Sequence, residues 1–158
     1  MRKPRVYLDT SAIGGCLDEE FAEESLALME MARQGEVTLL ISDVLLDELE
    51  DPPSEVGAVL DSIPPEHVEI VRRTEEVLQL RDKYLSSEIL GAKWADDALH
   101  VAYATIAKAD LLVSWNFKHI VHYDKVRKFN GVNLSEGYTI LDIRTPTEVM
   151  TQDENESF

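Results

Sequence analysis

The chain has one cysteine and no long apolar run, and each of these deficits excludes a class of protein. Cys16 has no second cysteine with which to form an internal disulfide, and there is no Cys/His spacing of the zinc-binding type. No apolar stretch approaches the ~20 residues that cross a bilayer. The basic start, MRKPRVYLDT, is interrupted at Asp9 and does not resemble a signal peptide. We therefore expect a soluble cytoplasmic protein without a membrane partner.

Basic residues are also few. Fifteen Lys and Arg face 31 Asp and Glu, which gives a net charge of −16. This balance argues against broad attraction to nucleic acids or anionic membranes. It does not exclude a nucleic-acid substrate, because metal ions held among carboxylates reverse the local sign of charge. The clustered bases are Arg72, Arg73, Lys118, Lys125, Arg127 and Lys128.

Length and composition predict one globular domain. The chain has 158 residues, of which 44% are hydrophobic and 29% charged, and this is ordinary for a single domain with its own core. Residues 1–150 are expected to form that domain. Residues 151–158, TQDENESF, are polar and acidic, and we expect a disordered tail. There is no internal repeat and no low-complexity linker.

Short apolar, β-branched stretches alternate with amphipathic ones. The apolar stretches predict strands at residues 5–9, 37–41, 67–71, 110–114 and 138–143. The amphipathic stretches predict helices at residues 18–33, 42–51, 54–63, 74–90, 95–108 and 119–129, followed by a turn at Asn130-Gly131. Such alternation implies an α/β sandwich with a small, mainly parallel sheet, whose binding sites lie at the carboxyl ends of the strands.

Three acids close or flank apolar segments. Asp9 lies in VYLDTS, Glu48 in SDVLLDEL and Asp97 in ADDALHVAYA. Carboxylates that repeatedly adjoin buried segments need a reason, and convergence on a divalent cation is the leading one. Hard oxygen ligands suit Mg²⁺ or Mn²⁺. A fourth polar element, SWNFKHI, places Asn116 and His119 after another apolar run.

Each of these residues also has a simpler interpretation. Asp9 could only form an Asx turn, and Glu48 could be one more solvated acid. Asp96 and Asp97 could only stabilise a helix start through the helix dipole. Adjacent helical positions diverge by ~100°, so we expect Asp97 to point inward and Asp96 to lie at the rim. On general grounds His100 is more often a satisfied core or supporting histidine than a ligand.

The order of these motifs resembles a known family. LDTS, an EL pair on a helix, DALHVAYA, and a strand that ends in S-x-N-F look like the PIN-domain ribonucleases, in particular the VapC-type toxins of toxin-antitoxin pairs. The resemblance runs roughly from Val6 to Ile143. It implies a PIN-like three-layer sandwich with helices on both sides of a small sheet.

The resemblance also implies a function and its residues. It implies a metal-dependent endoribonuclease that acts as the toxin of a type II toxin-antitoxin system, with an RNA substrate, a cognate antitoxin and a homodimer. Asp9, Glu48 and Asp97 would hold Mg²⁺ or Mn²⁺, and Asn116 occupies the fourth catalytic position, where the family usually has aspartate. Asparagine lacks the charge, which leaves open whether one or two metals bind. Side chains that could support these ligands are Thr10, Ser11, Asp96, His100, Ser114 and His119.

The chemistry of phosphodiester hydrolysis agrees with this interpretation, since carboxylate-held Mg²⁺ can activate water and neutralise the phosphate. Ser11 and Cys16 have no obvious partnered base, so acyl transfer is not supported. One alternative is a haloacid-dehalogenase-like phosphatase, which needs a second Asp two residues after the first, where this chain has Ser11. The other is a catalytically silent PIN-like binding module. For a dimer interface, the helices with Leu26, Met29, Met31, Leu45 and Leu46 offer surplus apolar surface.

Overall fold

The computed structural model describes residues 3–50 and 55–156. At its centre is a five-stranded sheet in the order β3-β2-β1-β4-β5, and every neighbouring pair is parallel. The strands are β1 (Arg5–Leu8), β2 (Thr38–Ser42), β3 (Val68–Val71), β4 (Leu111–Val113) and β5 (Ile143–Arg144). The predicted α/β fold with a mainly parallel sheet is confirmed.

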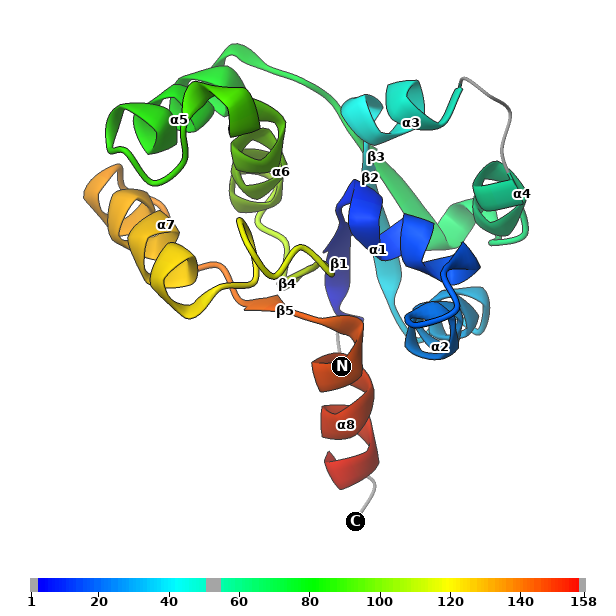
Figure 1. The fold of residues 1–158 in the computed structure, drawn as a ribbon. Coiled ribbons are helices and arrows are strands. Elements are labelled where there is room, and N and C mark those ends of the chain that lie inside the picture. Colours follow the sequence, from blue (N-terminus) through cyan, green and yellow to red (C-terminus); the bar gives the residue numbers. More distant parts are fainter. Residues whose placement is uncertain (1–2, 51–54, 157–158) are drawn as a thin grey trace.

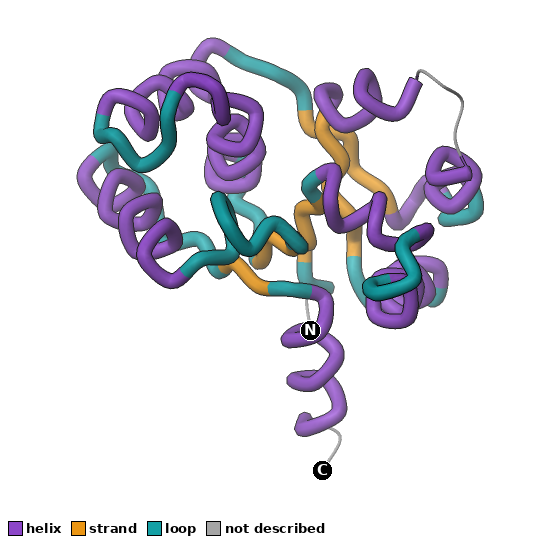
Figure 2. Tube along the Cα trace, viewed as in Figure 1, coloured by secondary structure: helices purple, strands orange, loops and turns teal. Residues whose placement is uncertain are grey.

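Helices cover both faces of the sheet (Figures 1 and 2). One side carries α1 (Thr10–Gly14), the 3-10 turn η1 (Gly15–Leu17), α2 (Ala22–Arg33) and α4 (Glu55–Asp61). The other side carries α5 (Glu75–Ser86), η3 (Ala92–Trp94), α6 (Ala95–Ile106) and α7 (Tyr123–Ser135). The remaining elements are α3 (Asp43–Glu50), η2 (Pro65–His67) and α8 (Pro146–Glu156). The result is three layers, as the resemblance implied.

The sheet separates two hydrophobic clusters. Tyr7 of β1 belongs to the cluster with α5, α6 and α7, whereas Val6 and Leu8 belong to the cluster with α1, α2 and α4. All three side chains are at most 1% exposed. Successive side chains of a strand point to opposite faces, so a strand covered on both faces is apolar throughout. Asp9 is the first charged residue after this apolar stretch.

Several predicted helix boundaries are confirmed. The Ser42 Oγ accepts a hydrogen bond from the Leu45 N–H at 3.1 Å, so Ser42 caps α3. The Thr74 Oγ1 accepts a hydrogen bond from the Val77 N–H at 3.2 Å, so Thr74 caps α5. Gly35 has φ +75°, a backbone conformation that glycine adopts without strain, and it ends the α2 region.

The segment after β4 differs from the prediction. Residues 119–129 were expected to form a short helix that ends at an Asn130-Gly131 turn, but α7 begins at Tyr123 and continues through that pair to Ser135. The Asn130 side chain accepts a hydrogen bond from the Leu141 N–H at 2.8 Å and donates one to the Leu141 carbonyl at 3.0 Å. A turn-forming residue is thus used as a tertiary tether from within a helix. The same tether holds the chain before β5, and β5 covers Ile143–Arg144 instead of the predicted residues 138–143.

Two further boundaries need correction. Helix α5 ends at Ser86 rather than near residue 90, and Glu88 then adopts a positive φ of 60°. Residues 151–156, predicted as part of a disordered tail, are helical because α8 continues to Glu156. Within α8, Val149 and Met150 pack against the cluster around α2, and this contact anchors the helix. Residues 157–158 lie outside the described residues, as does Ser54, the predicted start of α4.

No helix in the part of the chain that the structure describes is long and apolar enough to cross a membrane.

A buried polar group at α7 offers a test of the fold. Asn133 is 0% exposed, accepts a hydrogen bond from the Tyr84 hydroxyl and lies 3.2 Å from the Thr105 Oγ1. Asn133→Ala removes the acceptor of that buried hydroxyl and leaves it only the longer 3.3 Å contact with the Thr105 Oγ1, so we expect a loss of about 1–3 kcal/mol in the free energy of unfolding. Urea unfolding measures it. Leu134→Ala, at a neighbouring side chain that is 57% exposed, is the control and should change stability much less. Equal losses in the two variants would contradict this account.

Candidate active site

The candidate residues lie at the carboxyl edge of the sheet, around the ends of β1 and β4. These two strands are adjacent, yet the chain visits β2 and β3 between them. Such a switch in the direction of winding leaves a crevice above the strand ends in which α/β proteins bind ligands. Asp9 follows β1, Ser114 follows β4, and the first turn of α6 supplies Asp97.

Asp9 is the most constrained of the acids. It is 2% exposed. Its Oδ1 accepts hydrogen bonds from the Ala12 N–H at 2.9 Å and the Ser11 hydroxyl at 2.8 Å, and its Oδ2 accepts one from the Ser114 hydroxyl at 2.6 Å. Thr10 and Ser11 are the first residues of α1, and Asp9 is its N-cap. The simpler interpretation, a local structural role, is therefore part of what Asp9 does.

The pKa of Asp9 is raised above its ordinary value of 3.8. Burial is the largest cause, because removing a carboxylate from water disfavours its charged form. The nearby His100 and the hydrogen bonds from Ser114, Ser11 and Ala12 lower the pKa but do not outweigh burial. The site thus holds a carboxylate that its own hydrogen bonds do not fully compensate.

Glu48 approaches the same point from α3. Its carboxylate accepts a short hydrogen bond from the Thr10 hydroxyl, and the Thr10 Oγ1 lies 3.3 Å from the His100 Nε2. The His100 Nδ1 lies 2.7 Å from the Tyr7 hydroxyl. His100 is only 3% exposed, so it is a supporting histidine with partners at both ring nitrogens. Glu48 itself is exposed and reaches the edge of the site from outside.

The two aspartates of α6 have different environments. The Asp97 Oδ2 lies 2.8 Å from the His119 Nδ1, and the side chain of Asp97 is 23% exposed. Asp96 is exposed. This agrees with the expectation that Asp97 faces inward and Asp96 lies at the rim. Since His119 is buried, it holds the Asp97 carboxylate in a fixed position.

Asn116 uses its side chain to form a local turn. Its Oδ1 accepts a hydrogen bond from the His119 N–H at 2.9 Å, and its backbone carbonyl accepts one from the Val121 N–H at 2.8 Å. The Asn116 N–H donates to the Ser114 Oγ at 2.9 Å. One hydrogen-bonded path therefore runs from Asp9 through Ser114, Asn116 and His119 to Asp97.

The donor chemistry of the three acids fits a hard divalent cation, since all are carboxylates at one edge of the sheet. The uncompensated burial of Asp9 also favours a nearby cation. However, within residues 3–50 and 55–156, no three His, Cys, Asp or Glu side chains are grouped so that they could hold one metal ion. Glu48 and Asp97 would have to exchange their present hydrogen bonds for metal ligation. The predicted ligand set of Asp9, Glu48 and Asp97 therefore stays a prediction.

A stacked aromatic pair, Trp115 and Phe21, lies beside the site and was not predicted from the sequence. The Trp115 ring stacks on Phe21 with centroids 4.2 Å apart, and its Nε1 donates to the Ser25 Oγ at 2.8 Å. The Trp115 N–H donates to the Ser11 Oγ at 2.9 Å. A Cβ on Gly15 would come within 2.6 Å of the Trp115 Nε1, so this glycine permits the close approach. The sequence signal was the tryptophan within SWNF, which we interpreted only through its asparagine.

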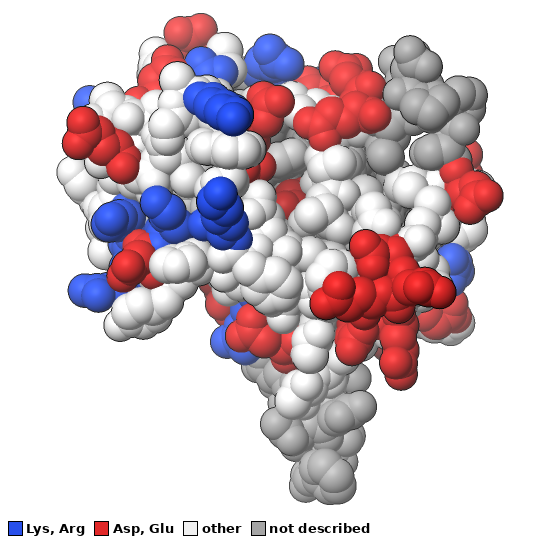
Figure 3. All heavy atoms as spheres, in the orientation of Figure 1, with Lys and Arg blue, Asp and Glu red and all other residues white. Residues whose placement is uncertain are grey.

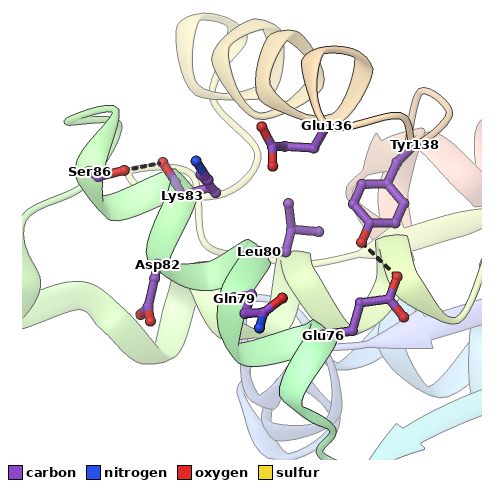
Figure 4. A pocket seen from close by; sticks show the side chains of 8 residues that line it. All are labelled: Glu76, Gln79, Leu80, Asp82, Lys83, Ser86, Glu136 and Tyr138. Carbon is purple, nitrogen blue, oxygen red and sulfur yellow. Dashed lines mark hydrogen bonds between the residues drawn. The ribbon is translucent and has the colours of Figure 1, made fainter.

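The hollow between α5 and the end of α7 is a separate feature (Figure 4). Glu76, Leu80, Lys83, Glu136 and Tyr138 line it, and the Tyr138 hydroxyl donates to the Glu76 carboxylate at 2.7 Å. None of the three candidate acids lines this hollow.

Charge is unevenly distributed over the surface. Figure 3 shows Asp and Glu side chains crowded over the region of η1 and α2, whereas Lys and Arg side chains gather over the region of α7. The first group corresponds to the acid-rich residues 18–24, and α7 contains Lys125, Arg127 and Lys128. A local basic region therefore lies on the same face as the acidic one, although the net charge of the chain is −16.

Comparison with known proteins adds a likeness of fold. No family model matches the chain, and neither does any curated protein. The structure is similar to a chain in the crystal structure of VapBC2 from Rickettsia felis, solved bound to a DNA fragment from their promoter, with a TM-score of 0.58 and 16% sequence identity. The match covers 89% of this chain and 98% of that chain. At this identity it shows the fold, and the predicted PIN-like fold is confirmed.

The raised pKa of Asp9 gives a prediction with a definite sign. Between the ordinary pKa of 3.8 and the higher folded pKa, the folded state binds more protons than the unfolded state, so the free energy of unfolding falls as pH rises. Asp9→Asn removes the charge and keeps an oxygen for the Ala12 N–H. In EDTA we expect a higher melting temperature for the variant than for wild type at pH 8, with the difference shrinking as pH falls towards 4.

Thermal unfolding followed by circular dichroism at both pH values measures this difference. The exposed Asp96→Asn is the matched control, and it should follow wild type at each pH. Added Mn²⁺ should raise the melting temperature of wild type more than that of Asp9→Asn, because the variant lacks one ligand charge. If Asp9→Asn and wild type melted together at pH 8, burial would not dominate the energetics of Asp9.

Proposed function

We propose that this protein is a metal-dependent endoribonuclease and the toxin component of a type II toxin-antitoxin system. The observation that carries the proposal is the buried carboxylate of Asp9 at the switch point of the sheet, joined by hydrogen bonds to the segment that holds Asp97. Glu48 adjoins the same point through Thr10. The shared fold with a chain of a VapBC2 complex supports the toxin assignment.

The residues of the chain have distinct tasks in this proposal. Asp9, Glu48 and Asp97 would hold Mg²⁺ or Mn²⁺, which supplies an activated water and neutralises charge on the phosphate when bound. Ser11 and Ser114 fix the position of the Asp9 carboxylate, and His119 fixes that of Asp97. Binding of a cation lowers the cost of ionising Asp9, which its burial otherwise raises.

Nucleophilic catalysis by a side chain has little support. Cys16 is buried, and burial raises the pKa of its thiol to about 11, so the reactive thiolate is scarce at neutral pH. Ser11 donates to Asp9 and accepts from the Trp115 N–H, an arrangement that serves a structural link. Ser11 also stands where a haloacid-dehalogenase-like phosphatase needs its second aspartate, which disfavours that alternative.

A second candidate function is a catalytically silent PIN-like binding module. Two observations favour it: no three potential ligand side chains in the described residues are grouped around one point, and the Asn116 oxygen is engaged in a turn. The retention of three carboxylates around the switch point favours the enzyme. Manganese-dependent cleavage of single-stranded RNA by purified, partner-free protein distinguishes the two.

The proposed partners are a cognate antitoxin and a second copy of the chain. Carboxylates at the site edge are natural receptors for an inserted Arg or Lys of an antitoxin. Leu26 and Leu46 are 41% and 40% exposed and remain available for an interface, whereas Met29 and Leu45 are fully buried core residues. The apolar surface predicted for a homodimer is thus smaller than the sequence suggested. A cytoplasmic location, where RNA and antitoxin are found together, belongs to the same proposal.

The adjacent aspartates of α6 provide a matched test of activity. Asp97→Asn removes a proposed ligand charge that His119 holds in place, so we expect cleavage of single-stranded RNA in Mn²⁺ to fall by at least ~100-fold, about 2.7 kcal/mol of transition-state stabilisation. Asp96→Asn, one residue away and exposed, should retain most of the activity. Initial rates on a labelled oligonucleotide measure both. Comparable losses in the two variants would refute the assignment of Asp97.

Asn116→Asp tests the fourth position. One aspartate oxygen can keep the hydrogen bond from the His119 N–H, and the other adds a charged ligand to the site. We expect the variant to need a lower Mg²⁺ concentration for half-maximal cleavage, with little change in rate at saturating metal, because an added ligand charge strengthens the hold on a divalent cation. A Mg²⁺ titration of wild type and variant on one RNA provides the comparison. Equal midpoints would mean that residue 116 serves only the turn.

A further inference from the structure

Trp94 is a partly exposed aromatic side chain beside the candidate site. It is 37% exposed, whereas Trp115, the second of the two tryptophans, is 8% exposed and within the core. Trp94 ends η3 directly before α6, and its side chain makes no capping hydrogen bond there. Burial of its ring in the core therefore does not account for its position.

The Trp94 ring is linked to a proposed catalytic residue through one side chain. Its centroid lies 4.2 Å from that of the His119 ring, with the planes at 39°. His119 in turn holds Asp97 at 2.8 Å. Figure 1 shows the segment between β4 and α7, which carries His119, next to α6. A ligand on the remaining surface of the Trp94 ring would thus lie beside the Asp97 end of the site.

Two lysines from different segments meet at the same ring. The Lys93 Nζ lies 5.1 Å from the Trp94 ring centroid and the Lys118 Nζ 5.9 Å from it. Both side chains are exposed, and neither forms an ion pair with an acid in residues 3–50 or 55–156. By contrast, Arg5 pairs with Glu69 and is committed to the fold. In a chain of net charge −16, two exposed ammonium groups near one aromatic ring are a local exception.

This combination suits an unpaired nucleotide. Every base has a π-face that stacks on an aromatic ring, and the phosphates on either side of the base attract cations. A duplex cannot offer an unstacked base, so the arrangement selects single-stranded RNA. A single lysine above an aromatic ring is a common surface contact. Here two lysines from different segments lie at one ring, and that ring packs on His119, which holds the proposed ligand Asp97.

We propose that Trp94, Lys93 and Lys118 form a subsite that stacks one unpaired RNA base and contacts its flanking phosphates, next to the phosphodiester that the acids would cleave. The subsite rests on the proposed ribonuclease function. The subsite adds to that function the position at which the RNA strand is held and a preference for unpaired RNA. The carboxylates of the site repel a polyanion, whereas the two lysines supply a positive potential that attracts it.

Binding without cleavage tests the subsite apart from the enzyme activity. A fluorescein-labelled, unstructured 12-nucleotide RNA is titrated with protein in EDTA at 50 mM salt, and anisotropy gives the dissociation constant. We expect Trp94→Ala to weaken binding roughly 5- to 140-fold, the range that corresponds to one base stacked on an aromatic ring. Trp94→Phe should restore much of the affinity. Lys93→Gln and Lys118→Gln should each reduce the slope of log affinity against log salt by about 0.7.

A matched control is present in the chain. Tyr123 is 75% exposed and lies with its ring 5.4 Å from the Arg127 guanidinium carbon, a second exposed aromatic-cation pair. Tyr123→Ala should leave RNA affinity unchanged. Intrinsic fluorescence gives an independent readout: RNA should quench wild-type emission, and the quenching should be mostly lost in Trp94→Phe, which retains Trp115.

The possible outcomes separate this proposal from the ribonuclease proposal. Trp94-dependent RNA binding without any cleavage in Mn²⁺ would support the subsite and count against the enzyme. Cleavage with unchanged affinity and KM in Trp94→Ala would overturn the subsite alone, as would the absence of RNA binding by wild type at micromolar protein. Equal weakening by Tyr123→Ala, or equal affinity for a duplex of the same sequence, would also overturn it. Competition by an acidic peptide as strong as that by RNA would assign the surface to a protein partner instead.

Discussion

The structure of the site depends on the burial of one carboxylate, that of Asp9. Its oxygens accept hydrogen bonds from α1, which begins at Thr10, and from Ser114 at the end of β4. These contacts join the first helix to two adjacent central strands. Because burial raises the pKa of this group, the same position that organises the local fold also favours a compensating positive charge. Structural and chemical roles are thus combined in a single residue, and a substitution there affects both.

The hydroxyl groups around the acids leave the negative charge of the site available to a cation. Ser114, Thr10 and Ser11 are neutral donors that hold carboxylates in place without cancelling their charge. A lysine or arginine in their place would form an internal ion pair and leave no charge for a cation. His119 differs from these hydroxyl groups, because its ring is buried and its Nδ1 lies 2.8 Å from the Asp97 Oδ2. The position of the Asp97 carboxylate is therefore set by a ring rather than by a hydroxyl group.

The sequence predicted those features that depend on local chemistry and on alternation of apolar stretches. Buried strands, the helix starts at Ser42 and Thr74 and the inward direction of Asp97 all follow from short-range rules. Errors arose where a distant contact overrode a local preference. Asn130-Gly131 has turn composition, but the bonds between Asn130 and Leu141 stabilise a helix through it. A prediction from neighbouring residues alone does not include Leu141, which lies eleven residues from Asn130 and beyond a loop.

The site shows the same division between local and distant information. Its acids were identifiable because their types and neighbours are informative, but their mutual arrangement depends on the turn that Asn116 forms with His119. The stacked pair of Trp115 and Phe21 and the ring of Trp94 were not predicted as parts of the site, since an aromatic residue in a sequence is more often a core residue than a surface residue. Only the fold brings Lys118, from the segment after β4, to the ring that precedes α6. A net charge of −16 argues against a polyanionic substrate only if charge is spread evenly, and this assembly of two lysines beside the acids shows that it is not.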